Sequence, residues 1–375
     1  MSVSVLSFKQ VFNLIKAVGP TRTVVVEGEH GIGKTALYHA ICADPQFQDH
    51  IRAGIIDCAQ LSDGALFMYD IDREKGVSRE LPNERFGITH DNQKGINGAR
   101  PVIQFFDEIG KAPTYVKNQI AAPLYERRMG VMHYPDGSVV FAATNLGVEG
   151  LGDSLAPHMM DRIVRVQMRK PTQKEWLDNF GLPRGLNAAV LALTDQYPQL
   201  FDSFVDYEPG GKYADQTMIK HNARIFNPRA VQGKWATPRS LHAASDIVDQ
   251  FDRGLFDEDT LTAALTGTVG QVVTADLMSM VRYKSSLVKY EDVIADPEHA
   301  KLSDNPNAQL VQVFQFVTNV ADRTEAEALT TYVERMRGEF QLLFCNQVSE
   351  SSKARHFVTI ARFASLMRKH SVKFG

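Results

Sequence analysis

The 375-residue sequence predicts a chain of the α/β class, with a mainly parallel sheet in its amino-terminal half and helices in the remainder. Three observations predict this. Short β-branched or apolar runs alternate with helical stretches up to about residue 170, a glycine-rich segment joins the first run to a helix, and strand signals fade after Pro171. We therefore expect an α/β domain over residues 1–170, a helical lid over residues 171–300 and a helical C-terminal extension over residues 301–375.

The amino-terminal half has the pattern of strands connected by helices. Apolar residues recur at helical spacing over residues 5–16, and Gly19-Pro20 ends that helix. The run 23–26 is short and continuously apolar or β-branched, as buried parallel strands are. We expect strands at residues 23–26, 53–57, 101–106, 138–143 and 163–166, and further helices at residues 35–43 and 115–128. Residues 61–100 lack clear periodicity and form a longer segment than a simple connection between two elements needs, so we expect a functional loop region there.

The second half has helical patterns throughout. We expect helices at residues 175–180, 186–197, 239–249, 261–280, 307–320 and 324–344. Thr324 and Glu327 match a capping box before the last of these. Thr237 and Pro238 form a favourable helix start, with threonine as the cap and proline at the first helical position.

Composition excludes several classes of protein. No apolar run approaches the roughly 20 residues of a membrane helix, and the amino end lacks the layout of an export signal. We therefore expect a cytoplasmic protein with no membrane partner. Three scattered cysteines predict neither a zinc site nor a disulfide framework. The formal net charge of -3 shows that the chain as a whole lacks the excess of basic residues that is typical of nucleic-acid-binding proteins.

The glycine-rich segment from Gly28 to Thr35 fits the phosphate-loop pattern of glycine, four residues and Gly-Lys-Thr, placed after a strand and before a helix. Its glycines let backbone N–H groups turn toward one anion at a helix amino terminus. Lys34 is expected to contact the β- and γ-phosphates of ATP, and Thr35 to ligate Mg2+. The candidate nucleotide-binding residues here are Gly28, Gly31, Ile32, Gly33, Lys34, Thr35 and Ala36.

Polar side chains follow two further strands. Asp107 comes after the strand at 101–106 and is expected to hold the magnesium shell, while Glu108 orients and activates the attacking water. Asn145 follows the strand at 138–143 and is expected to hydrogen-bond the γ-phosphate or the water. The sequence thus predicts a catalytic set at the carboxyl ends of the strands.

Two arginines complete the candidate set. Arg162 precedes the strand at 163–166 and is expected to reach a neighbouring subunit's γ-phosphate, the alternative being an ion pair within the chain to Asp161 or a glutamate. Arg239 lies near the start of a helix, where its charge opposes the helix dipole and indicates an anionic partner. It is expected to reach the nucleotide from the lid.

In this order, Lys34, Asp107-Glu108, Asn145, Arg162 and Arg239 resemble the site residues of AAA+ ATPases, and more specifically of the MoxR-like branch found in bacteria and phages. The likeness covers about residues 1–300 and includes the stretch from Glu108 to Pro113 and the Thr-Pro-Arg-Ser segment that contains Arg239. It implies a P-loop AAA+ domain in a ring, usually a hexamer, with ATP between subunits. It also implies a remodelled client protein, often one with a von Willebrand factor A domain. Arg127 and Arg128 also lie where such an interface could use them, so any of three arginines is a candidate to act in trans.

The leading hypothesis is therefore a ring ATPase that uses ATP and Mg2+ to remodel or activate a partner protein, with residues 61–100 as the source of its central loops. One alternative is a nucleic-acid motor or helicase loader on the same fold. Another is a nucleotide-dependent assembly switch with slow turnover. The segment 351–375 carries six basic residues and no acid, and Phe357, Ile360, Ala361, Ala364 and Met367 form one apolar helical face in it. It is either a terminal helix packed on its own lid or a docking surface for an acidic partner or nucleic acid.

Overall fold

The computed structural model describes residues 5–62, 64–147, 161–207, 211–212, 222–227 and 233–373. The chain divides into two compact units, Met1–Lys170 and Pro171–Gly375. None of the helices in the described ranges combines the length and apolar character needed to span a bilayer.

The first unit is built on a six-stranded sheet in which all neighbouring strands run parallel, in the order β1-β10-β2-β9-β6-β3. Its strands are β1 (Val5–Leu6), β2 (Thr23–Glu27), β3 (Ile51–Asp57), β6 (Val102–Asp107), β9 (Val139–Thr144) and β10 (Ile163–Met168). The predicted α/β class is thereby confirmed. The five expected strands are all present, and no end differs from the expected one by more than two residues.

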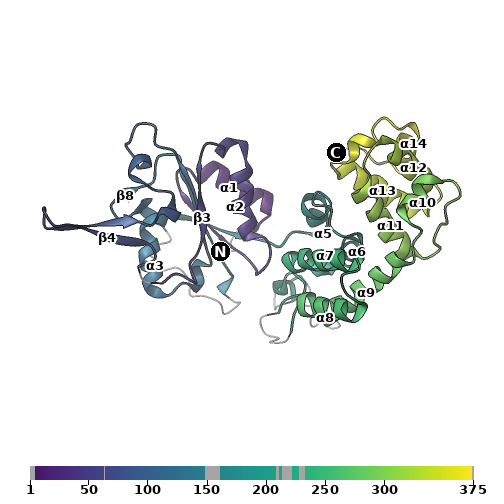
Figure 1. Ribbon diagram of the computed structural model, residues 1–375, viewed down its shortest axis with the longest axis horizontal. Coiled ribbons are helices and arrows are strands. Elements are labelled where there is room, and N and C mark those ends of the chain that lie inside the picture. Colours follow the sequence, from purple (N-terminus) through teal and green to yellow (C-terminus); the bar gives the residue numbers. More distant parts are fainter. Residues whose placement is uncertain are drawn as a thin grey trace. The chain divides into compact units, whose positions relative to one another are not determined.

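Helices cover both faces of this sheet (Figure 1). The α-helices among the described residues of the unit are α1 (Phe8–Val18), α2 (Lys34–Ala43) and α3 (Thr114–Ala121). Successive residues of a strand point to opposite faces, so Val24 and Val26 share a core with α1 and α2, whereas Val25 shares one with α3. Burial on both faces explains why these strands are continuous apolar runs in the sequence.

Two expected helices of this unit have different bounds. Val5 and Leu6 are not helical but pair with β10 as an edge strand, and α1 begins only after Ser7, which forms a capping box with Gln10. The helix expected at 115–128 ends at Ala121 and continues as a wider turn.

The region 61–100 contains an antiparallel hairpin that the sequence pattern did not predict. It consists of β4 (Phe67–Asp72) and β5 (Val77–Pro82), and it extends away from the sheet (Figure 1). A second short hairpin, β7 (Arg128–Met129) and β8 (Met132–His133), lies at its base. There the φ of Gly130 is 55°, and a Cβ on Gly130 would lie 2.6 Å from the carbonyl oxygen of Glu80. This close approach requires glycine.

The β4–β5 hairpin exposes large apolar side chains. Met68, Tyr69, Ile71 and Val77 are exposed by 71%, 64%, 66% and 46%. Side chains on both of its faces are exposed, so the sequence has no alternation of apolar and polar residues that would mark the strands.

The second unit consists of helices joined by turns and loops. Its helices are α5 (Gln173–Trp176), α6 (Ala188–Gln196), α7 (Pro238–Asp252), α8 (Glu258–Val269), α9 (Gln271–Ser285), α10 (Tyr290–Ala295), α11 (Pro306–Asn319), α12 (Arg323–Val333), α13 (Gly338–Glu350) and α14 (Ala361–Lys369). One hydrophobic core runs from Trp176 to Met367, and α11 packs against α6 and α9. Residues on both sides of the expected boundary near residue 300 therefore share this core, and a separate lid and extension remain a prediction.

Several helix ends in this unit differ from the expected ones. The helix expected at 261–280 is two helices, because Gly270 has a φ of 85° and ends α8. The stretch expected at 324–344 is likewise divided into α12 and α13. Asp322 caps α12, so the capping box expected at Thr324 is wrong. The cap at Thr237 is confirmed, and its side chain accepts a hydrogen bond from the Ser240 N–H.

The basic C-terminal segment packs on its own unit. Of the residues that form an apolar helical face in this segment, Phe357, Ile360 and Met367 are buried in the shared core, whereas Ala361 is exposed. Helix α14 contacts α12 and α13. The structure thus favours the first of the two alternatives for this segment.

Candidate functional site

The candidate site residues of the first unit gather where three neighbouring strands end. The phosphate loop follows β2, Asp107 ends β6, and Asn145 follows β9. Strand β9 lies between β2 and β6 in the sheet, so Asn145 lies between the loop and the acids. The carboxyl edge of an open parallel sheet is the usual place for a ligand site in such folds.

The phosphate loop adopts the backbone conformation that its glycines permit. Gly31 and Gly33 have φ values of 74° and 100°, which lie in the left-handed region that residues other than glycine rarely adopt. Helix α2 then begins at Lys34 with no side chain capping its amino end and no acid in its first turn. The Ala36 N–H donates to the Gly33 carbonyl oxygen at 2.9 Å, and the helix dipole favours a negative charge at this end.

Residue 28 must be glycine because neighbouring atoms leave no room for a Cβ, and not because its backbone has a positive φ. A Cβ there would lie 2.8 Å from the Met168 carbonyl oxygen and 2.6 Å from Ile32. The loop therefore lies directly against β10, which ends at Met168.

Lys34 is 6% exposed, and its ammonium donates to three oxygens of its own chain. The acceptors are the carbonyl oxygens of Gly28 and Glu29, both at 2.8 Å, and Oδ1 of Asn145 at 2.7 Å. A buried ammonium needs such partners. Phosphate oxygens placed in the loop would be competing acceptors for the same protons.

Thr35 and Asp107 meet as expected of a pair of magnesium ligands. The Thr35 hydroxyl donates to Oδ2 of Asp107 at 2.8 Å, and burial raises the pKa of the Asp107 carboxyl above its ordinary value. The described residues contain no group of three or more histidine, cysteine, aspartate or glutamate side chains arranged to hold a metal ion by themselves. Two oxygen ligands suit Mg2+, which usually keeps several waters and binds substrate phosphates.

Glu108 is held at both its backbone and its carboxylate. Its φ is 55°, and its N–H donates to Oδ1 of Asp107 at 2.9 Å. Asn145 Nδ2 lies 3.2 Å from Oε2 and 3.5 Å from Oε1, and Lys111 Nζ lies 3.1 Å from Oε2. Asn145 thus contacts the candidate base through its amide nitrogen and Lys34 through its amide oxygen.

Arg127 is directed into the first unit. It donates hydrogen bonds to the carbonyl oxygens of Gly19 and Ser138, and burial lowers the pKa of its guanidinium. These contacts hold Arg127 within its own unit, and the choice among the three arginines as the one that acts in trans remains a prediction.

Arg128 and Arg162 share one acidic neighbour. Arg128 Nε lies 2.5 Å from Oε2 of Glu126, whereas Arg162 Nη1 is 4.0 Å from Oε1 of the same carboxylate. Arg162 has 60% of its side chain exposed. The alternative, an ion pair between Arg162 and a glutamate of the same chain, is thus present, but the pair is long and exposed and contributes little to stability.

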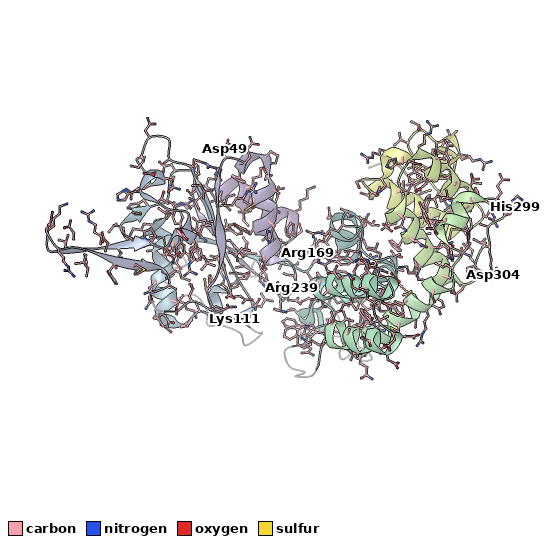
Figure 2. All side chains as sticks on the ribbon, viewed as in Figure 1. Asp49, Lys111, Arg169, Arg239, His299 and Asp304 are labelled. Carbon is pink, nitrogen blue, oxygen red and sulfur yellow. The ribbon has the colours of Figure 1, made fainter. Side chains whose placement is uncertain are left out.

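Arg239 lies at the second position of α7 in the second unit (Figure 2). Thr237 and Ser240 form the capping box around it. Its expected role toward the nucleotide remains a prediction.

Sequence reasoning missed three residues that support the site. Lys111 pairs with Glu108, Thr144 Oγ1 accepts from the Gly110 N–H at 3.2 Å, and Lys170 pairs with Glu29 at 3.7 Å. A spacing of three residues in a turn signals the first pair. No local signal indicates the other two contacts, because they join distant segments.

No protein-family model matches this sequence, and no curated protein matches it. Among solved structures, NtrX from Brucella abortus is similar with a TM-score of 0.33 and 14% identity, over 99% of this chain and 68% of that chain. NtrX in complex with ADP is similar with a TM-score of 0.33 and 15% identity, over 99% of this chain and 69% of that chain. A RuvB variant from Thermotoga maritima is similar with a TM-score of 0.37 and 13% identity, over 78% of this chain and 75% of that chain. Because these scores and identities are low, we infer function from the geometry of the chain's own residues.

Proposed function

We propose that this chain is an ATP-hydrolysing AAA+ ATPase of MoxR-like type, which acts as a ring and remodels or activates a partner protein. The observation that supports the hydrolytic part most directly is the continuous series of contacts from Lys34 through Asn145 to Glu108. It joins a phosphate-binding loop to a candidate general base.

The residues divide the work of phosphoryl transfer. Lys34 and the N–H groups of the loop bind the β- and γ-phosphates. Thr35 and Asp107 hold Mg2+, which when bound neutralises charge on the phosphates. Glu108 accepts a proton from water as the water oxygen bonds to the γ-phosphorus, and the bond from that phosphorus to the departing ADP oxygen breaks.

The assembly is proposed from the exposed arginine. Arg162 is the candidate to complete a neighbouring subunit's site, with Arg128 second because its guanidinium is already paired with Glu126. A homo-oligomeric ring, hexameric by family resemblance, would place ATP at each interface, and Arg239 would close on it from the second unit. A client with a von Willebrand factor A domain also rests on the resemblance alone.

Three variants test hydrolysis. Lys34→Ala is expected to abolish ATP binding, because the buried ammonium is the principal cation in the loop. Glu108→Gln is expected to keep ATP bound and to lower turnover by at least about 100-fold, because an amide cannot accept the proton. Lys94→Ala is the control, because Lys94 forms an exposed pair with Asp136. Normal turnover of Glu108→Gln, or stimulation by DNA or RNA with steep salt dependence, would contradict the proposal.

Assembly is tested separately by light scattering. Glu108→Gln with ATP and Mg2+ is expected to form a closed oligomer, and a chain that stays monomeric at high concentration would refute the ring. Mixing Arg162→Ala subunits with Glu108→Gln subunits should restore some activity only if Arg162 acts across an interface.

The β4–β5 hairpin is the proposed contact with the client. Its exposed apolar side chains offer a surface that the first unit does not cover. In the Glu108→Gln background with ATP, Ile71→Ala is expected to reduce the amount of client trapped on the ring. Leu255→Ala is a matched control, because both side chains are 66% exposed and Leu255 lies in the second unit. Equal trapping by both variants would remove the hairpin from this role.

A further inference from the structure

We propose that Lys111 is a positioning residue for hydrolysis: it holds Oε2 of Glu108 so that Oε1 is the oxygen that takes the proton from water. This inference rests on the proposed function and assigns a role to Lys111, which is not among the candidate site residues predicted from the sequence. Lys111 follows the acids in a short turn of the first unit (Figure 2).

The turn that carries Lys111 is fixed from several sides. The Lys111 N–H donates to the Glu108 carbonyl oxygen at 3.0 Å, and the Gly110 N–H donates to the Thr144 hydroxyl at the end of β9. Ile109 has no exposed surface. The backbone of Lys111 is therefore fixed relative to Glu108, and only its side chain has freedom left to lose on pairing.

The contacts on the carboxylate are unequal. Among the described residues, Oε2 has Lys111 Nζ at 3.1 Å and Asn145 Nδ2 at 3.2 Å, whereas Oε1 has Asn145 Nδ2 at 3.5 Å as its one side-chain donor. A donor at 3.5 Å is at the limit of a hydrogen bond. Two donors thus occupy Oε2, and the lone pairs of Oε1 are the ones more open to water.

This asymmetry requires a cation at residue 111. Asn145 Nδ2 approaches both carboxylate oxygens, so by itself it does not fix the rotation of the carboxylate group. Lys111 contacts one oxygen and selects that rotation. Small displacements of a reacting group are costly, since near-attack geometry needs the reacting atoms about 3–3.5 Å apart.

The test compares Lys111→Met with Lys111→Arg in steady-state hydrolysis of ATP. Methionine keeps the length of the side chain without its charge, and we expect kcat to fall about tenfold with KM and ATP affinity changed less than about twofold. Arginine should restore most of the rate, since it can also donate to Oε2. Lys94→Met, which removes an exposed lysine elsewhere in the same unit, should leave the rate unchanged.

A double variant separates positioning from general damage. In the Glu108→Gln background, Lys111→Met should cause no further loss of rate, because the group that it positions no longer acts as a base. Unchanged or faster turnover of Lys111→Met would overturn the inference, as would a further loss in the double variant or an equal loss of ATP affinity. If Lys111→Met does not fold, as judged by thermal unfolding, Lys111→Leu takes its place with the same expected outcomes, because leucine also lacks a donor.

Failure of this inference can be distinguished from failure of the proposed function. If Glu108→Gln turns over ATP normally, the proposed function is wrong. If Glu108→Gln is inactive and Lys111→Met retains the full rate, only the role of Lys111 is wrong.

Discussion

The buried ion pair between Glu29 and Lys170 predicts how strongly the phosphate loop is anchored to the end of the first unit. Glu29 is the second residue of the loop, and Lys170 is the last residue of the unit. Their side chains are 7% and 4% exposed, with Nζ and Oε2 3.7 Å apart. The change that tests this pair is Lys170→Met, which keeps the length of the side chain and leaves the Glu29 carboxylate buried without this ammonium.

The expected loss of stability is about 3 kcal/mol. Removing one partner of a buried ion pair costs about 3–5 kcal/mol, and the lower end applies because the two atoms are farther apart than in a hydrogen bond. For a domain of this size, such a loss lowers the melting temperature by about 6–12 °C. Lys94→Met is the matched control, because Lys94 and Asp136 are 54% and 84% exposed and an exposed pair contributes less than about 1 kcal/mol.

The assay must report on the first unit alone. The two tryptophans, Trp176 and Trp235, lie in the second unit, so their fluorescence monitors that unit. Far-UV circular dichroism of the full chain records both units, and hydrogen exchange of peptides from β2 and β10 isolates the first. We expect the melting transition of the first unit to shift while the tryptophan signal remains unchanged.

Two results would refute this reasoning. A melting temperature of Lys170→Met within about 2 °C of the wild type would mean that the pair contributes no more than an exposed one. A double variant with Glu29→Gln that is far less stable than Lys170→Met would also contradict it, since the second change neutralises the charge left unpaired.

Three further predictions concern the same unit. Gly28→Ala should weaken ATP binding about tenfold or more in a fluorescent nucleotide titration, because its Cβ would press against a backbone carbonyl of β10; Gly54→Ala, with no atom within 4 Å of its Cβ, should not. Arg127→Ala should lower the free energy of unfolding by about 2 kcal/mol in urea titrations, whereas Arg162→Ala should change it by less than about 0.5 kcal/mol and slow only turnover; the reverse order would contradict the assigned orientations. Burial raises the pKa of the Asp107 carboxyl in the folded state above its ordinary 3.8. The folded state therefore holds this proton more tightly than the unfolded state does, and the protein loses free energy of unfolding as the pH rises from 3.8 through the raised pKa. Without Mg2+, Asp107→Asn should therefore melt higher than the wild type at pH 8 and progressively less so toward pH 4, and a difference that grows on acidification would refute this.

The strands of the sheet could be predicted from the sequence because burial on both faces leaves a continuous apolar run. The β4–β5 hairpin could not, since exposure of both of its faces removes the periodic signal. The break between α8 and α9 was missed because helical periodicity continues on both sides of Gly270. Gly270 has a φ of 85°, and a Cβ there would lie 2.1 Å from the carbonyl oxygen of Lys234, a residue of a distant segment.

Side-chain orientation also depended on packing. Arg127 and Arg128 are adjacent and chemically alike, and sequence reasoning could not separate them. The fold turns Arg127 inward to the carbonyl of Ser138, while Arg128 pairs with Glu126 near the surface. No property of either residue alone predicts that difference.

The sequence by itself determined the local chemistry: a glycine-rich turn before a helix, two acids after one strand and an amide after another. These depend on backbone geometry within a few residues, which the residue types dictate. The tertiary structure alone decided which of these groups touch. Lys34 and Asn145 are 111 residues apart, and Asn145 and Glu108 are 37 apart. They meet because β9 lies between β2 and β6, and that order results from the packing of the whole sheet between its helices.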